Sequence, residues 1–345
     1  MNIIMETFQS PSFVALGYTL LNSIWQALII LLVVVGLLRL ITSSSTRYAV
    51  ATTGMLLIGA SSIGTFVYLL NDARRPSPAG EIALQNYFPQ QILKTDTPLD
   101  TYLHSGKNLI QSGLPIFILG WSLGAFIFNL RVVAGLFYIE KLKHGAVFLD
   151  NEWHARIKQI AGNLKISRMV KLAESPAISS PVVIGFFKPI ILIPISLCTS
   201  LPPAQLETIF IHELMHIRRN DYLINIFQSI VEAIYFFNPF TWAISGIIRR
   251  EREHCCDDAV IKLHGSPREY VHALASLQEV VISKPGLSLS FAENRNQLLN
   301  RIKRIMEKPV KNYSSRERMV PALLVVLGLL CASWISAQTV ITKDK

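Results

Sequence analysis

Two histidines and a glutamate lie close together in the stretch IFIHELMHIRRND, residues 209–221. His212 and His216 are four residues apart, so on a helix their imidazoles share one face, about 5 to 6 Å from each other. At that separation both rings can bind one metal ion at about 2.0 to 2.1 Å, the usual zinc–nitrogen distance. Glu213 lies one step around the helix, where its carboxylate can act as a base toward a water activated by the metal. The spacing therefore predicts a hydrolytic zinc site.

A hydrolytic zinc site needs a third protein ligand and one open position. The stretch RREREHCCDDAV, residues 249–260, offers Glu253 and, four residues later on the same helical face, Asp257. We predict Glu253 as the third ligand and Asp257 as the residue that orients a ligating histidine. The neighbouring candidates are Glu251, His254, Cys255, Cys256 and Asp258. A cysteine ligand would suit a structural zinc site and would leave Glu213 without a role.

The simplest alternative is a helix that carries two surface histidines, beside a second helix with a solvated charged face. Apolar residues flank both histidines in IFIHELMHI, residues 209–217. That environment is expected for a buried site and not for a solvated one.

The composition indicates that a membrane protein positions this site. The 345 residues are 51% hydrophobic and only 16% charged, whereas soluble domains carry about 25% charged residues. Four blocks contain no Asp, Glu, Lys or Arg, and each exceeds the roughly 20 apolar residues that span a bilayer: residues 13–38, 48–71, 108–130 and 319–342. Buried core helices are the alternative, but they rarely stay uncharged over such lengths. The first block is too long for a cleavable signal peptide and has no cleavage site after it, so we expect it to remain as an anchor.

The positions of Lys and Arg predict the orientation of these spans. Basic residues cluster between the first two blocks, after the third and before the fourth, whereas the loop 72–107 balances four basic residues against four acidic ones. By the positive-inside rule, the N-terminus and this loop face outward. The expected domains are a membrane region (1–130) with three spans, a cytoplasmic domain (131–318), a fourth span (319–342) and a short outer tail (343–345).

The net charge of +10 has two explanations. Nucleic-acid binding is one, but no nucleic-acid-binding motif accompanies the charge, so we expect no direct contact with nucleic acid. Basic residues near span ends favour attraction to anionic membrane lipids instead. The four cysteines predict no disulfide framework, since three of them lie in the expected cytoplasmic domain.

Short patterns predict the elements of the cytoplasmic domain. Residues 151–166 form a helical pattern with Trp153, Ile157, Ile160 and Leu164 on one face. Residues 180–197 contain prolines and Gly185 between β-branched runs, which favours two strands. A helix is expected to begin at Pro202 or Pro203. The apolar stretch 222–248 is interrupted by Glu232 and by Asn238-Pro239. A fifth span is an alternative there, but we expect helices packed on the domain and against the inner membrane surface.

The stretches SPVVIGFFKPIILIP, HELMH, NPFTW and RREREHCCDDAV, with LNSIWQALI near the N-terminus, resemble the BlaR/MecR antirepressor family of beta-lactam-sensing membrane zinc peptidases. The similarity extends from about residue 20 to residue 319 in the same order. The resemblance implies an α-helical protein of the bacterial inner membrane with four transmembrane helices and an α+β, gluzincin-type zinc protease domain in the cytoplasm. It also implies that His212, His216 and Glu253 bind one Zn²⁺ and that Glu213 is the general base.

The best-known members of that family continue after the fourth span into an extracellular penicillin-binding domain. This sequence stops at Lys345 and has no S-x-x-K nucleophile motif outside the membrane. We therefore expect the inducing signal to reach the outer loop, a partner protein or the membrane itself.

The combined interpretation is a membrane zinc endopeptidase that cleaves a cytoplasmic protein, specifically a helix-turn-helix transcriptional repressor, after a signal. The strand PVVIGF is expected to hold substrate as an added β-strand, and a homodimer is compatible with the sequence. One alternative is a housekeeping quality-control protease of the membrane. Another is a non-catalytic signal transducer whose metal site is structural.

Self-cleavage is implied by the resemblance, and one segment suits it. Pro285 and Gly286 break the preceding helix, and LSLSF, residues 287–291, is uncharged and alternates apolar with polar residues. An extended segment of this kind can add to an edge strand, and its tethering raises its effective concentration to roughly millimolar. We predict cleavage near Ser290 and Phe291; a plain strand or loop is the alternative.

Overall fold

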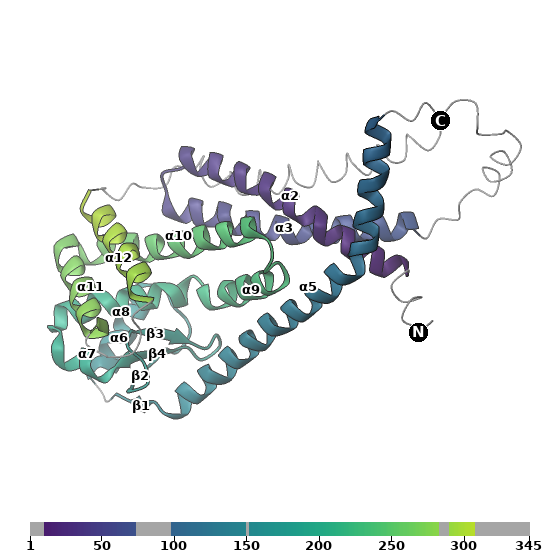
Figure 1. Cartoon of the computed structure of the whole chain (residues 1–345). Coiled ribbons are helices and arrows are strands. Elements are labelled where there is room, and N and C mark those ends of the chain that lie inside the picture. The colour runs from purple at the N-terminus through teal and green to yellow at the C-terminus, as the bar shows by residue number, and fades with distance from the viewer. Residues whose placement is uncertain (1–9, 74–97, 150–151, 283–289, 308–345) are drawn as a thin grey trace, which may run out of the picture.

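The structure is a computed structural model that describes residues 10–73, 98–149, 152–282 and 290–307 (Figure 1). Three helices in this part are long and apolar enough to cross a membrane: α2 (Pro11–Leu40), α3 (Ser44–Ala73) and α5 (Pro98–His144). They contain the first three blocks that the sequence predicts as spans. The expected fourth span, 319–342, and the tail, 343–345, lie outside the described residues. A four-span topology therefore stays a prediction.

Helices α2 and α3 form a hairpin that turns at residues 41–43. The Ser10 hydroxyl accepts a hydrogen bond from the Phe13 N–H at 3.4 Å, and Pro11 occupies the first turn of α2, where its missing N–H has no helical partner to lose. The two helices approach closely, because a Cβ added at Gly54 would lie 2.6 Å from the Val34 side chain. Small residues at such a crossing are typical of membrane helix pairs.

Helix α5 differs from the expected third span at both ends. The sequence predicts a span over 108–130, whereas α5 begins at Pro98 and continues to His144. No residue between 131 and 144 breaks the helix, because the one glycine in this stretch, Gly135, is tolerated and the stretch contains no proline. The expected boundary at residue 131 is thus a change of polarity within one helix, and the first strand begins only at Val147.

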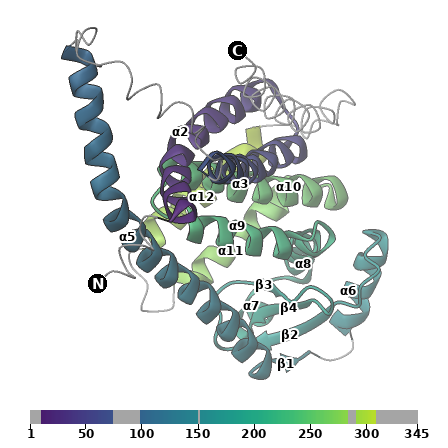
Figure 2. The same cartoon turned by 90° about the vertical axis from the view of Figure 1, so that its right-hand side faces the viewer.

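A four-stranded sheet lies at the end of the molecule opposite α2 and α3 (Figures 1 and 2). Its order is β1 (Val147–Phe148), β2 (Lys171–Ser175), β4 (Ile190–Pro194), β3 (Val182–Ile184). Strand β4 is central, parallel to β2 and antiparallel to β3. The two expected strands are confirmed as β3 and β4, and Gly185 between them has φ +81°, a conformation that favours glycine. Strands β1 and β2 have no clear sequence signal and were not expected.

Helices cover the sheet and enclose the main core. The predicted helix at residues 151–166 is confirmed as α6 (Glu152–Asn163), and the predicted start at Pro203 is confirmed for α8 (Pro203–Arg218). The short α7 (Ile195–Ser200) precedes α8. Helix α11 (Pro267–Ile282) packs on α8. Fully buried apolar side chains from the sheet, α8 and α11 meet in one cluster, including Leu172, Ile191, Ile193, Phe210, Leu214 and Tyr270. The last described helix, α12 (Ser290–Glu307), contacts α10 and α11.

The apolar stretch 222–248 takes a different position from the expected one. It forms a hairpin of α9 (Asp221–Ile234) and the first half of α10 (Pro239–His264), which packs along α2, α3 and α5 instead of lying across their ends (Figure 2). At its tip, Asn238 Nδ2 donates a hydrogen bond to the Ser23 carbonyl at 3.0 Å. Ser23 is 17 residues before Leu40, about 25 Å along α2. The one acidic side chain within residues 222–248, Glu232, is paired with Arg249 at 2.7 Å.

Candidate metal centre

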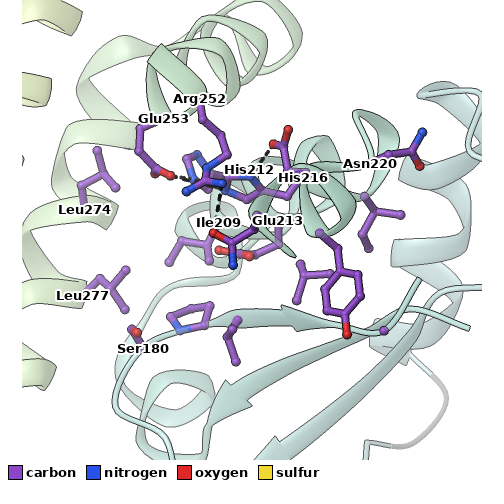
Figure 3. Close-up of a pocket in the computed structure, with 18 of the residues that line it drawn as sticks. Ser180, Ile209, His212, Glu213, His216, Asn220, Arg252, Glu253, Leu274 and Leu277 are labelled. Atoms are coloured by element: carbon purple, nitrogen blue, oxygen red, sulfur yellow. Dashed lines mark hydrogen bonds and ion pairs between the residues drawn. The ribbon is translucent and has the colours of Figure 1, made fainter. Parts of the chain in front are cut away.

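Helix α8 brings His212 and His216 together on its buried side. Their Nε2 atoms are 3.3 Å apart, and the ring planes are at 81°. The helix is anchored by fully buried Phe210 and Leu214, which fix its rotation about its own axis. His212 is only 7% exposed. The arrangement expected from the four-residue spacing is therefore present, with two nitrogen atoms aimed at a common point (Figure 3).

Glu253, on α10, is the third side chain at this point. Its carboxylate oxygens lie 3.4 Å from His212 Nε2 and 3.9 Å from His216 Nε2. Ligand atoms around a tetrahedral zinc ion at about 2.0 to 2.1 Å are about 3.3 to 3.4 Å apart. The three side chains therefore fit one zinc ion with little adjustment, and the donor set of two imidazoles and one carboxylate suits a hydrolytic site.

The competing acids on α10 face elsewhere. Glu251 is buried against Arg47 of α3, at 2.7 Å, and against His254, at 3.2 Å. Burial by itself would raise the pKa of Glu251, but the hydrogen bonds and charges of His254 and Arg47 lower it to about 2. Asp258 accepts hydrogen bonds from Ser44 and Arg304. Neither carboxylate points at the histidines.

Cys256 is the nearest alternative ligand. One atom each of His212, His216 and Cys256 lie within 4.8 Å of one another. The thiol sulfur, however, approaches Nδ1 of His216, at 3.5 Å, and not Nε2. Burial raises the pKa of the Cys256 thiol. The geometry thus favours Glu253 over Cys256 as the third ligand.

The Nδ1 atoms of both histidines are held by oxygen partners. Asp221 Oδ2 lies 2.8 Å from His216 Nδ1. The Tyr270 hydroxyl lies 2.8 Å from His212 Nδ1 and donates its proton to Asp257 Oδ1 at 2.7 Å. Since the hydroxyl has only one proton, it must accept from His212. These partners hold a proton on Nδ1 of each imidazole, so Nε2 is the nitrogen left to bind a metal.

Asp257 supports His212 through Tyr270 and not by a direct hydrogen bond, because its nearer oxygen is 3.6 Å from His212 Nδ1. Asp257 is fully buried and receives two hydrogen bonds from Arg301 of α12, at 2.6 and 3.1 Å. Burial alone would raise the pKa of Asp257, but the Arg301 guanidinium holds it below its usual value. Arg301 also lies 3.4 Å from the Glu253 carboxylate.

Three supporting residues were not predicted from the sequence. Asp221 stands five residues after His216, and this short spacing was the one available signal. Tyr270 and Arg301 come from α11 and α12, far along the chain, and no local pattern marks them.

The metal centre opens into a cavity of about 410 Å³. Glu213 lines this cavity beside both histidines and is largely buried (Figure 3). The cavity is also lined by Val182 and Val183 of β3, an edge strand of the described sheet. Leu274 and Leu277 of α11 form a further apolar wall. The cavity thus places a carboxylate base, a metal site and a strand edge around one space.

The predicted cleavage residues lie at the start of α12. Ser290 is the first residue of that helix and Phe291 the second, whereas an extended segment was expected. Residues 287–289, the rest of LSLSF, lie outside the described residues. The expectation of an extended strand is wrong for Ser290 and Phe291, because the helical pattern of α12 includes both.

Comparison with known proteins identifies the relatives of this chain. It is 26% identical to the regulatory protein BlaR1 of Bacillus licheniformis over 234 residues, which cover 66% of this chain and 38% of the relative. It is 26% identical to BlaR1 of Staphylococcus aureus over 199 residues, 56% of this chain and 34% of the relative. The methicillin resistance mecR1 protein of Staphylococcus aureus matches at 22% over 150 residues, 43% and 25% of the two chains. The chain spans about two fifths or less of the length of these relatives.

A family-level match covers more of the chain than any of these pairs. The BlaR1 peptidase M56 family matches residues 18–305, a range that includes most of α2, all of α8 and α10, and Arg301. This confirms the resemblance to the BlaR/MecR type, and with it a membrane metallopeptidase. The chain belongs to the BlaR1 peptidase family, M56.

Proposed function

We propose that this protein is a zinc endopeptidase of the bacterial inner membrane whose active site faces the cytoplasm. The observation that supports this most directly is the convergence of three ligand atoms, from His212, His216 and Glu253, within 3.3 to 3.9 Å of one another. Both Nδ1 atoms are already committed to other partners. One Zn²⁺ in a gluzincin-type site is the occupant that suits this donor set.

The residues around the site have separate tasks in peptide hydrolysis. Zinc held here would polarise the scissile carbonyl and make water more acidic. Glu213 would take a proton from the attacking water and pass it to the leaving amine. Asp221 holds the His216 ring, and Asp257 acts on the His212 ring through Tyr270. These contacts keep the two imidazole rings in place while the carbonyl carbon of the substrate becomes tetrahedral.

Strand β3 is proposed to hold the substrate. It pairs with β4 on one side only within the described sheet, and Val182 and Val183 line the same cavity as Glu213. An extended peptide that adds to this edge would pass in front of the zinc ligands. The wall formed by Leu274 and Leu277 would accept an apolar side chain of that peptide.

Regulated cleavage of a cytoplasmic helix-turn-helix repressor is the activity we favour over housekeeping proteolysis. The relatives are named as a regulatory protein and as a methicillin resistance protein, which supports a role in signalling. The substrate would reach the site from the cytoplasm, since Arg39 and Arg47 flank the turn between α2 and α3. In this topology the domain at 131–318 is cytoplasmic, the N-terminus is outside and 319–342 is the fourth span.

Self-cleavage near Ser290 and Phe291 remains part of the proposal, with one added requirement. Ser290 is 11 residues before Arg301, about 16 Å along α12, and Arg301 contacts Glu253 in the zinc site. A protease binds its substrate extended, so the first turn of α12 must unwind and leave its present position before cleavage.

Substitution of the general base tests the proposal. Glu213→Gln protein is expected to keep zinc and to lose cleavage of the repressor by several orders of magnitude. Glu207→Gln is the matched control, because Glu207 lies on the same helix and pairs with exposed Arg156 at 2.8 Å, away from the zinc site. Mass spectrometry of both proteins shows whether the segment 283–301 is cut.

Three outcomes would contradict the proposal. Equal repressor cleavage by Glu213→Gln protein would point to another protease. Cleavage of misfolded membrane proteins but not of repressors would indicate quality control. Bound zinc without cleavage in any variant would indicate a signal transducer with a structural metal site.

A further inference from the structure

A second cavity, of about 1150 Å³, lies where α2 and α3 meet the peptidase domain. It is enclosed by the α2–α3 turn, the end of α8, the middle of α10 and Arg304 of α12. The cavity is lined by Glu251, Cys255 and Asp258 of α10, whereas Glu253 of the same helix turns to the metal centre. It is therefore a separate space, and peptide hydrolysis as derived above does not use it.

The lining of this cavity is strongly cationic. Two carboxylates, Glu251 and Asp258, stand against seven basic side chains: Arg39, Arg47, Arg218, Arg219, Arg250, Lys262 and Arg304. Three of the basic residues are paired, to Glu251 at 2.7 Å, to Asp221 at 3.4 Å and to Asp258 at 2.6 Å. Within the described part of the chain, Arg39, Arg218, Arg250 and Lys262 form no ion pair. An excess of unpaired cations around one space favours an anionic ligand.

Hydroxyl groups and a helix end add to this preference. The α2–α3 turn contributes Thr42, Ser43, Ser44 and Ser45 to the lining. Helix α3 begins at Ser44, so its first backbone N–H groups, which have no partner within the helix, lie at the cavity. Cationic side chains, hydroxyls and a helix N-terminus together are the groups that bind phosphate oxygens.

The cavity also has an apolar part on the membrane side. Val35 and Leu38 belong to the last turns of α2, and Ile247 precedes the first arginines of α10. In the sequence, Val35 and Leu38 precede Arg39 and Ile247 precedes Arg250. The apolar side chains therefore lie closer to the middle of the proposed membrane than the two arginines do. A free phosphate ion makes no favourable contact with such an apolar wall, whereas the glycerol and upper acyl chains of a phospholipid would pack on it.

We infer that this cavity binds the headgroup of an anionic phospholipid of the cytoplasmic leaflet. Its phosphate lies among Arg218, Arg250 and the α2–α3 turn, and its acyl chains run along α2 and α10. The bound lipid fastens the spans to the peptidase domain at the place where Ser44 and Arg304 both bond Asp258, at 2.5 and 2.6 Å. The inference rests on the proposed topology, which places the α2–α3 turn at the cytoplasmic surface.

Native mass spectrometry of the full-length protein in neutral detergent tests this inference. Delipidated protein is titrated with phosphatidylglycerol and, separately, with phosphatidylcholine. The wild type is expected to bind one phosphatidylglycerol in preference to phosphatidylcholine. An Arg218→Gln/Arg250→Gln double variant is expected to bind it about thirtyfold more weakly, since each cation near a membrane surface contributes about fivefold.

The control is a Lys158→Gln/Arg268→Gln double variant, which removes the same charge from exposed positions that do not line the cavity. It is expected to bind phosphatidylglycerol as the wild type does. Equal weakening in the control, equal binding of phosphatidylcholine by the wild type, or full competition by inorganic phosphate would each overturn the inference. The readout is lipid binding, so Glu213→Gln protein should give the wild-type result whether or not the peptidase proposal survives.

Discussion

The buried pair of Asp257 and Arg301 joins the helix before the expected fourth span to the metal centre. The Asp257 side chain is 0% exposed and that of Arg301 19% exposed, and their closest atoms are 2.6 Å apart. Arg301→Ala leaves a buried carboxylate without its counter-charge. Removal of one partner from a buried ion pair typically costs about 3 to 5 kcal/mol. For a domain of this size, that corresponds to a fall of roughly 6 to 20 °C in the thermal unfolding midpoint.

The same substitution should weaken zinc binding. Asp257 orients His212 through Tyr270, and it is held in turn by Arg301. Loss of an outer partner of a metal ligand typically lowers metal affinity by about 10- to 100-fold. Thermal unfolding of the metal-free protein and competition with a zinc chelator measure the two effects separately.

Arg304→Ala is the matched control for Arg301→Ala. Arg304 lies three residues later on α12 with a similar exposure, 20%, and it also pairs with a carboxylate at 2.6 Å. Its partner, Asp258, is 23% exposed, so the loss should be about 1 kcal/mol or less. Adding Asp257→Asn to Arg301→Ala should recover part of the stability, because the unpaired buried charge is gone. Equal effects of the two arginines, with no recovery in the double variant, would refute this reasoning.

Three further predictions concern the metal, pH and topology. Purified protein is expected to hold about one zinc ion. Metal analysis should show that Glu253→Ala protein loses the zinc and that Glu251→Ala protein keeps it; the reverse result would assign the third ligand to Glu251. The pKa of Glu251 in the folded state, about 2, lies below its ordinary value of 4.5. Ionised Glu251 therefore contributes about 3 kcal/mol to the free energy of unfolding above pH 4.5, and this contribution is lost as the pH falls toward 2. Unfolding of Glu251→Gln protein should lack that component of the pH dependence; an unchanged profile would disprove the assignment. In a cysteine-free background, an impermeant thiol reagent added outside should label a cysteine at position 77 but not one at 264, and labelling of both would contradict the topology.

The placement of the two histidines side by side was predictable because it depends on local periodicity. A helix has 3.6 residues per turn wherever it lies, so the spacing of His212 and His216 alone places both rings on one side. Span positions were predictable for a similar reason, since hydrophobicity over about 20 residues is a property of a segment and not of its neighbours. Three of the four predicted spans fall within described helices, and the strands at residues 180–197 and the start of α8 are confirmed.

The position of the α9–α10 hairpin was not predictable in this way. Its sequence is apolar but contains Glu232 and Asn238, which argued for the membrane surface. In the structure Glu232 is neutralised by Arg249, and Asn238 bonds the Ser23 carbonyl. Arg249 comes from the other helix of the hairpin and the Ser23 carbonyl from a distant segment, so both partners are supplied only by tertiary packing. They let the hairpin lie along the spans.

The sequence by itself determined which residue types form the site: two histidines one helical turn apart, an adjacent glutamate and an acid-rich helix to complete the set. Only the tertiary structure decided which acid on α10 faces the histidines. Glu251 and Glu253 are two residues apart, about 200° around the helix, so they cannot face the same side. The rotation of α10 is set by its packing on α3, where Glu251 meets Arg47, and that leaves Glu253 toward α8. Tyr270 and Arg301 support the site for the same reason, because packing between distant segments brings them to the His212 imidazole and to Asp257. Asp221, in contrast, reaches the His216 imidazole from only five residues along the chain.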